Sequence, residues 1–176
     1  MILISEWYVV RVKSGEEDDA KELLESYDLD VKVLSREYYW KSKGQVIKKN
    51  KKLFPGYIFV ISDLNYIDFD IKLNSIRYQN GKIYKNLKYD NTGIPALSET
   101  EIAMIRKMTG DYKNDVVESS IGFIEGDKVR IVDGPLFGLE SNIAYINRHK
   151  RIARLSIDFL GEVREIEVPL EIVAKY

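Results

Sequence analysis

Apolar positions in the first half of the chain predict alternating strands and helices. Residues 7–12 are almost continuously apolar and rich in aromatic and β-branched side chains, which predicts a central strand covered on both faces. Ser14 followed by Glu17 is a capping-box pattern, and apolar residues at helical spacing then predict a helix over about 16–27. A second apolar strand is expected at 57–61.

Weaker signals lie between and after these elements. Short strands are predicted at about 31–34 and 38–40, and the lysine-rich residues 43–52 are expected to form a solvated loop or a hairpin. Asp63 is a candidate cap of a short helix.

Two further pairs of residues mark element ends. Asn80-Gly81 is typical of a hairpin turn. Ser98 with Glu101 repeats the capping box and predicts another helix after it. The first half is therefore α/β in character.

The helical periodicity stops at residues 110–122, a polar segment that we interpret as a linker. Beyond it the pattern predicts only short strands, at about 128–132, 142–147, 152–159, 163–168 and 171–174. Five short strands in about fifty residues favour a small barrel. In the strand at 152–159 alternate apolar residues share one face, so Arg154 should meet solvent or a partner.

Composition removes most catalytic and metal chemistry. The 176 residues include no cysteine and one histidine, His149, which excludes thiolate metal sites and cysteine nucleophiles and makes a histidine metal centre improbable. We expect His149 to be an exposed loop residue, and Asp68 and Asp70 to be part of an acidic loop instead of a metal pair. The sequence predicts no cofactor, no signal peptide and no membrane segment, and is compatible with a cytoplasmic location.

Charge is polarised along the chain although the net charge is only −1. Residues 16–30 carry eight acids against Lys21, whereas residues 32–52 carry eight bases against Glu37. A second basic segment lies at 148–154, with no acid between Glu140 and Asp158. These two basic segments are the candidate polyanion surfaces.

Four segments occur in a fixed order along the chain. They are Trp7-Tyr8-Val9-Val10 with Gly15 and Glu17, Leu53-Phe54-Pro55-Gly56-Tyr57, Pro95-Ala96-Leu97-Ser98 before Glu101, and Gly126-Asp127-Lys128-Val129-Arg130-Ile131 with Asp133-Gly134-Pro135. In this order they resemble the NusG family of transcription elongation factors. Each segment alone is a weak signal, but together they span almost the whole chain.

The resemblance implies an α+β protein of two domains. Residues 1–111 would form a NusG-type α/β domain, an antiparallel sheet flanked by helices, that binds RNA polymerase. Residues 112–122 would be a linker, and residues 123–176 a KOW domain with an SH3-like β-barrel. The implied polymerase-binding residues are Trp7, Tyr8, Phe54, Pro55 and Tyr57, although from one sequence each aromatic is also explained by a place in the core.

Departures from the family pattern favour a specialised paralogue. Leu136 and Ser141 stand where housekeeping members usually have Phe and Gly, and Leu160 replaces a ribosome-facing Phe. Where one paralogue type, RfaH, reads DNA, this chain has Asp68-Phe69-Asp70, a poor surface for phosphates. The basic segments instead make the chain most similar to the LoaP antiterminator type, which recognises an RNA hairpin.

The candidate RNA-binding residues come from the two basic segments. They are Arg148, Lys150, Arg151, Arg154, Lys48, Lys49, Lys51 and Lys52. For the lysines a solvated loop is an equally good interpretation, although Tyr38, Tyr39, Trp40 and Tyr57 nearby are stacking partners of the kind that single-stranded nucleic acid uses.

The sequence thus predicts a monomeric, non-catalytic antitermination factor whose partners are RNA polymerase and an RNA hairpin. A ribosomal protein or termination factor is a further candidate partner of the KOW domain. Two alternatives stay open: a housekeeping-type NusG that couples polymerase to the ribosome or a termination factor, and a translation-associated KOW module that binds RNA. An enzyme is the third choice.

Overall fold

The structure is a computed structural model that describes residues 5–81, 83–86, 96–110 and 115–176. Its described residues divide into two compact units. The first unit draws on Met1–Val33, Phe54–Ile102 and Phe159–Glu162, and the second on Leu34–Leu53, Ala103–Asp158 and Val163–Tyr176. The predicted α+β fold class is confirmed.

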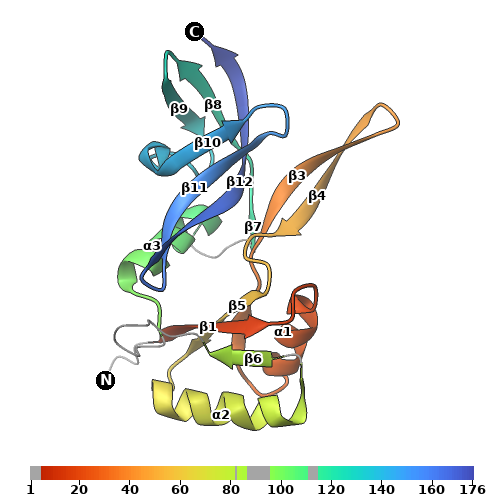
Figure 1. The fold of residues 1–176 in the computed structure, drawn as a ribbon, viewed down its shortest axis with the longest axis vertical. Coiled ribbons are helices and arrows are strands. Elements are labelled where there is room, and N and C mark those ends of the chain that lie inside the picture. Colours follow the sequence, from red (N-terminus) through yellow and green to blue (C-terminus); the bar gives the residue numbers. More distant parts are fainter. Residues whose placement is uncertain (1–4, 82, 87–95, 111–114) are drawn as a thin grey trace. The chain divides into compact units, whose positions relative to one another are not determined.

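An antiparallel sheet of four strands organises the first unit (Figure 1). Its order is β2 (Asp30–Lys32), β5 (Tyr57–Ser62), β1 (Glu6–Val12) and β6 (Ile83–Asn86). Strand β1 pairs with β5 on one side and β6 on the other, and residues 7–10 are all buried. The prediction of a central strand covered on both faces is therefore confirmed.

Two helices cover one face of this sheet. Helix α1 (Glu17–Glu25) contributes Ala20 and Leu24 to the core, and α2 (Tyr66–Gln79), which runs along the sheet in Figure 1, contributes Phe69, Leu73 and Ile76. These side chains pack against alternate sheet residues, among them Tyr8, Val10, Ile58 and Val60. The ring of Phe69 stacks on that of Tyr8 with centroids 4.0 Å apart.

The start of α1 differs from the predicted capping box. The N-cap residue is Glu16, which makes no side-chain cap bond. Glu17 does not reach back to Ser14; its carboxylate accepts hydrogen bonds from the backbone N–H groups of Gly15 (2.9 Å) and Gly56 (2.8 Å). The capping prediction was wrong because a contact with a distant loop takes the side chain that the local pattern assigned to the helix end.

Of the predictions made for the other helix ends, some were wrong and one is confirmed. Asn65, not Asp63, caps α2, with its Oδ1 accepting bonds from the N–H groups of residues 67 and 68. Asn80-Gly81 follows this helix and does not join two strands, so the hairpin prediction was wrong. The second capping box is confirmed, because Ser98 and Glu101 exchange backbone-to-side-chain bonds at the start of α3 (Glu99–Thr109). Pro95 and residues 112–114 lie outside the described residues.

The buried phenol of Tyr8 makes stability sensitive to alkaline pH. Its hydroxyl donates to the Leu64 carbonyl at 2.7 Å. Desolvation, then the negative charges of Glu6 and Asp70, raise its pKa from 10.0 to about 12. The unfolded chain loses this proton first, so the contribution is complete below pH 10 and is lost between pH 10 and 12.

We therefore expect the free energy of unfolding to fall by roughly 2 to 3 kcal/mol over that interval on account of Tyr8. Urea unfolding of the wild type and Tyr8→Phe at pH 8, 10 and 12 measures it. The variant should be less stable at pH 8, because it lacks the hydroxyl bond, yet lose less between pH 10 and 12. Parallel pH dependences would refute the assignment.

Five strands form the main sheet of the second unit, in the order β10 (Ile143–Asn147), β11 (Ile152–Phe159), β12 (Glu162–Lys175), β8 (Ser120–Glu125) and β9 (Lys128–Asp133). A short 3-10 helix, Glu140–Asn142, precedes β10. The strand expected at 152–159 has the predicted sidedness, with Ala153, Leu155, Ile157 and Phe159 buried and Arg154 exposed.

Two strand predictions in this unit were wrong. The strands expected at 163–168 and 171–174 are one strand, β12, which continues through Pro169 because its later part, from Leu170, pairs in parallel with β8. Strand β8 itself begins inside the segment interpreted as a linker and was missed, as was β7 (Val116–Val117). Neither is marked by local alternation strong enough to separate it from the polar residues around it.

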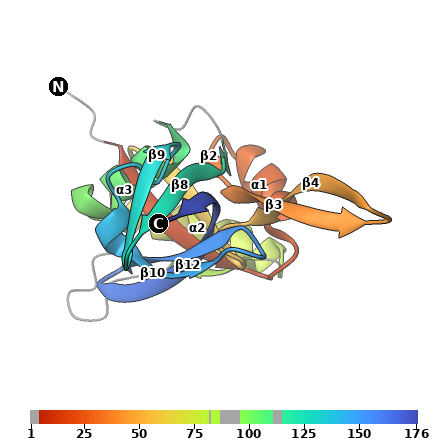
Figure 2. The same cartoon turned by 90° about the horizontal axis from the view of Figure 1, so that it is seen from above.

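A three-stranded sheet completes the second unit. Strands β3 (Ser35–Ser42) and β4 (Gln45–Lys52) form a long hairpin, seen as an extended ribbon in Figures 1 and 2, and β7 pairs in parallel with the start of β3. Lys43 and Gly44 both have positive φ, as a two-residue type I′ turn requires. Of the two interpretations of residues 43–52, the hairpin is confirmed.

No helix in the described part of the chain is long and apolar enough to cross a membrane.

Candidate functional site

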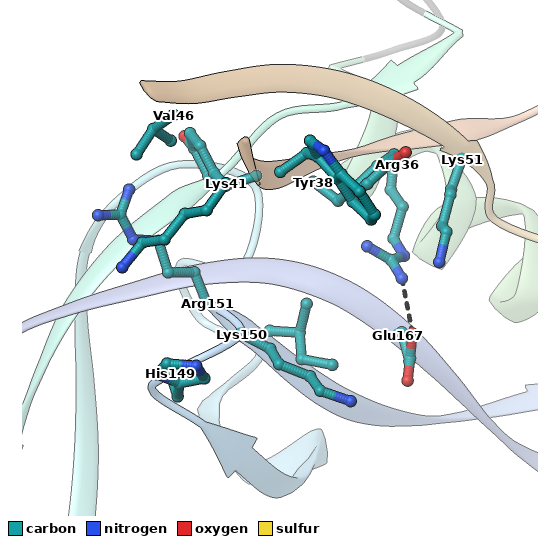
Figure 3. Close-up of a pocket in the computed structure, with 12 residues that line it drawn as sticks. Arg36, Tyr38, Lys41, Val46, Lys51, His149, Lys150, Arg151 and Glu167 are labelled. Atoms are coloured by element: carbon teal, nitrogen blue, oxygen red, sulfur yellow. Dashed lines mark hydrogen bonds and ion pairs between the residues drawn. The ribbon is translucent and has the colours of Figure 1, made fainter. Parts of the chain in front are cut away.

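The two basic segments of the sequence line one hollow in the second unit. We call it the β3 hollow; its volume is about 490 Å³. Figure 3 shows Tyr38, Lys41 and Val46 of the hairpin on one side and His149, Lys150 and Arg151 of the loop after β10 on the other. The full lining is Arg36, Tyr38, Tyr39, Trp40, Lys41, Val46, Lys51, His149, Lys150, Arg151, Ile152 and Glu167.

Cations stack on aromatic rings along the hairpin. Antiparallel pairing puts Tyr38 opposite Lys49 and Trp40 opposite Ile47, so these four side chains share one face. The ammonium of Lys51 lies 5.1 Å from the centroid of Tyr38, and that of Lys49 lies 5.4 Å from the centroid of Trp40. These contacts hold Lys51 beside a half-buried ring and Lys49 beside an exposed one, where a nucleic acid strand would find charge and stacking surface together.

Lys48 lies on the opposite face of the hairpin and is engaged by an acid. Its ammonium is 2.9 Å from Glu37, whose hydrogen bond and charge raise the pKa of Lys48. Glu37 also accepts a bond from the N–H of Ser119 at 3.1 Å. A phosphate would have to compete with this carboxylate, which makes Lys48 a weaker candidate for a phosphate contact than Lys49 or Lys51.

An ion pair between a buried arginine and an exposed glutamate attaches the hairpin to the main sheet of the same unit. Arg36 is 5% exposed and its guanidinium donates to the Glu167 carboxylate of β12 at 2.6 Å. A second nitrogen of the guanidinium lies 3.3 Å from the Glu37 carbonyl. Because Arg36 is buried and fully engaged, its role at the floor of the β3 hollow is to position β3, not to reach a ligand.

The loop between β10 and β11 has a fixed shape. The Asn147 side chain accepts a bond from the N–H of Lys150, and the Arg151 carbonyl accepts one from Leu170. The Arg151 guanidinium lies 4.9 Å from the centroid of Tyr39. His149 is exposed on this loop, as predicted.

Arg154 lies on the neighbouring strand and faces outward. Its guanidinium stacks on Tyr145 at 4.9 Å and is 3.9 Å from the Glu165 carboxylate. Among the described residues, no carboxylate pairs with Arg148, Lys150 or Arg151. The loop therefore presents more uncompensated charge than the strand beside it.

The residues predicted to bind polymerase divide between the two faces of the four-stranded sheet. Tyr8 packs under α2, whereas Trp7 and Phe54 lie with Phe59 on the other face, at centroid distances of 6.3 and 5.3 Å from its ring. Trp7, Tyr8 and Phe54 are buried, Tyr57 is half-buried and Pro55 is exposed.

Two aromatic side chains on this face were not singled out from the sequence. Phe59 occupies the face by alternation in β5, and Phe159, counted in the same compact unit, stacks on Phe54 with centroids 5.3 Å apart. The guanidinium of Arg11 lies 4.6 Å from the centroid of Tyr57 and fixes that ring at the margin. Tyr57 and Pro55 are thus the accessible members of the predicted set.

No group of three or more acidic or histidine side chains suited to a metal ion occurs among the described residues. Asp68 lies in the first turn of α2, where it accepts a bond from Asn65, and Phe69 beside it is core. The acidic loop expected here is therefore a helix.

Comparisons with known proteins agree with the fold. The family model described as "Transcription termination factor nusG" matches residues 5–106. Proteins named "Transcription termination/antitermination protein NusG" are 26% identical in both Borreliella burgdorferi (96% of this chain, 97% of that protein) and Thermus thermophilus (97% and 98%). A solved structure titled "Domain interaction in Thermotoga maritima NusG" is 23% identical, with a TM-score of 0.53 over 97% of this chain and 95% of that one. Since the family model covers more than half of the sequence, the chain belongs to the NusG family and is a NusG-type transcription factor.

Proposed function

We propose that this protein is an antitermination factor of the LoaP type. Its first domain, residues 1–111, binds RNA polymerase, and its basic surface binds an RNA hairpin in the leader of the operons it serves. One observation carries the RNA part: Lys51 and Arg151, 100 residues apart in the sequence, line the same hollow together with three aromatic side chains.

The electrostatics of the second unit support a polyanionic ligand. The lining of the β3 hollow contains five cationic side chains and one carboxylate, Glu167, which Arg36 already engages. Cations gathered without matching acids repel one another, so the arrangement has little use for stability. Phosphates would relieve that repulsion, and Arg151 offers the planar donors that bind them bidentately.

The aromatic side chains favour an RNA loop over a regular duplex. Side chains cannot read bases in the deep, narrow major groove of A-form RNA, so sequence-specific recognition falls on unpaired bases that stack on aromatic rings. Tyr38, Tyr39 and Trp40 supply such rings beside the cations. Selectivity for a hairpin would then come from its loop or from a bulge.

Transcription in vitro tests the proposal. Polymerase is run through a terminator placed after the leader of the protein's own operon, or after the same leader with its hairpin loop scrambled. We expect the full chain to increase readthrough only on the native leader. Equal readthrough on both templates would contradict recruitment by RNA.

A housekeeping NusG is the second candidate, because proteins named for termination and antitermination match this chain over almost its full length. Such a factor would act on both templates alike. Leu160 bears on this choice: it keeps an apolar side chain at the turn after β11 but has no ring, which would weaken coupling to a ribosomal protein. A simple KOW protein of the ribosome would not have the domain that the family model matches.

Polymerase binding should depend on the aromatic face that carries Tyr57. We expect Tyr57→Ala to weaken binding of the full chain to polymerase about thirtyfold, because Tyr57 is the accessible aromatic side chain of this face. Phe54→Ala should lose binding too, but it also opens a cavity at a buried site, so its effect is measured only on folded protein.

Biolayer interferometry with immobilised polymerase provides the measurement. Tyr78→Ala is the matched control, because Tyr78 is a 93% exposed tyrosine on α2, away from the Trp7 face. Unchanged affinity for folded Tyr57→Ala and folded Phe54→Ala would rule out this face as the polymerase contact.

A further inference from the structure

The β3 hollow has the features of a nucleotide site and not only of a charged surface. We propose that it holds one unpaired nucleobase, stacked on the indole of Trp40, with the adjoining phosphates on Arg151 and Lys150. The inference rests on the proposed function and makes it specific, because it assigns the recognition of a single base to named side chains.

The hollow has a suitable size and chemistry. Its volume of about 490 Å³ falls within the range of roughly 300 to 1,000 Å³ found for small-molecule sites. Rings from β3 and cations from the loop after β10 line it together, as Figure 3 shows for Tyr38, Lys150 and Arg151. A phosphate alone would have no use for the rings, and an apolar peptide would have no use for the cations.

Trp40 is the ring best placed to receive a base. It is 51% exposed, which is unusual for so large an apolar side chain, whereas Trp7 is 4% exposed. Lys49 lies near its ring at 5.4 Å, and among the described residues β3 has no strand partner other than β4 beyond Arg36. The ring therefore sits at a strand edge where a planar group can approach it.

The backbone of Arg151 supports a role for its side chain. Its φ of +54° lies in the left-handed region, which glycine or asparagine occupies at lower cost than arginine. The bond from Leu170 to its carbonyl holds that conformation, and stacking on Tyr39 orients the guanidinium. A strained residue whose side chain is held over a hollow is typical of a ligand-binding position.

The fluorescence of the full chain tests the proposal directly, because the protein has two tryptophans and only Trp40 is exposed. The probes are ten-nucleotide oligomers of U, C or A, their DNA counterparts, and an abasic oligomer with the same number of phosphates. We expect base-bearing oligomers to quench Trp40 and to bind at least tenfold more tightly than the abasic oligomer. Trp40→Leu should remove both the quenching and the tenfold preference.

Arg151→Gly isolates the cation without a cost in folding, because glycine suits a φ of +54°. Its melting temperature should equal or exceed that of the wild type, while its affinity for labelled oligomers falls about tenfold. Lys43→Gly is the matched control, because it also removes one positive charge at a position of positive φ. Lys43 lies in the turn between β3 and β4, outside the lining of the β3 hollow. Its affinity should stay within about twofold of the wild type.

The outcomes separate this inference from the proposed function. Equal affinity for abasic and base-bearing oligomers, without quenching, would overturn the base site and leave phosphate binding by the basic surface intact. Failure of every oligomer and of the leader hairpin to bind would overturn both. Quenching by RNA and DNA alike would support the site and extend it to unpaired bases of either nucleic acid.

Discussion

Reversing Arg148 and Arg151 together to Glu will reduce the affinity of the protein for its leader RNA by roughly a hundredfold or more at 0.1 M salt. Each arginine presents a charge without an acidic partner among the described residues. Its replacement removes a charge-assisted bond of about 1.5 to 3 kcal/mol and adds repulsion from the phosphates. Polymerase binding should be unchanged, because neither arginine belongs to the unit that carries the aromatic face.

The salt dependence of binding provides a second measure. If Arg148, Lys150, Arg151 and Arg154 each contact a phosphate, log affinity should fall with log salt at a slope of roughly −3, and loss of two contacts should bring it to about −1.5. Fluorescence anisotropy with labelled leader RNA between 50 and 300 mM salt measures both slopes. The residual slope reports the contacts that remain.

A double reversal on α2, Lys72→Glu with Arg77→Glu, controls for net charge. It changes the total charge by the same amount in the first unit, so it should alter affinity only slightly. Wild-type affinity in Arg148→Glu/Arg151→Glu would show that the loop is merely solvated. Recruitment would then depend on residues 48–52 or on DNA.

Much of the fold follows from periodicity because burial decides it. Continuous apolar runs predicted β1 and β5, and alternation in β11 predicted that Arg154 faces outward while Leu155 is core. These patterns depend only on neighbouring residues in the sequence, so they predict which side chains are buried without knowledge of the tertiary contacts. The resemblance to the family added the expectation of polymerase binding, which local patterns do not contain.

The wrong predictions arise where a residue that fits a local sequence pattern contacts a partner far away in the sequence instead. Glu17 looked like half of a capping box, but it bonds to Gly56. Residues 163–168 and 171–174 were predicted as two strands, but they belong to one strand, β12, whose later part pairs with β8. Nothing within a few residues of either position announces these contacts.

The candidate site was predictable in its parts and not in its assembly. Charge clustering identified both basic segments, and the aromatic cluster beside the lysines was noted as a stacking surface. Three things required the structure: the convergence of the segments on one hollow, the engagement of Lys48 by Glu37, and the ion pair of Arg36 with Glu167. The first and the third depend on side-chain contacts of the β3–β4 hairpin with segments far away in sequence, and the second depends on the register of the hairpin itself.

A hydrogen bond to Glu17 joins two of the sequence segments that resemble the family, the one that contains Glu17 and the one that contains Gly56. The side chain of Glu17 is 1% exposed, and its two carboxylate oxygens accept one bond each from Gly15 and Gly56. Gly56 has a φ of +81°, and a Cβ there would lie 2.8 Å from a guanidinium nitrogen of Arg11. The carboxylate thus ties the start of α1 to the turn that leads into Tyr57.

Glu17→Gln will therefore destabilise the protein by about 2 to 3 kcal/mol, although the two side chains have nearly the same shape. Glutamine has one oxygen acceptor, so its amino group would face one of the two N–H donors and leave a buried donor unsatisfied. Urea unfolding at pH 7 measures the loss. The neighbouring Glu16→Gln is the control, because Glu16 pairs with Lys13 at the surface and its loss should cost at most about 0.5 kcal/mol. Equal stabilities for the two variants would show that the carboxylate does not hold the turn. In that case the affinity of Glu17→Gln for polymerase should also match that of the wild type.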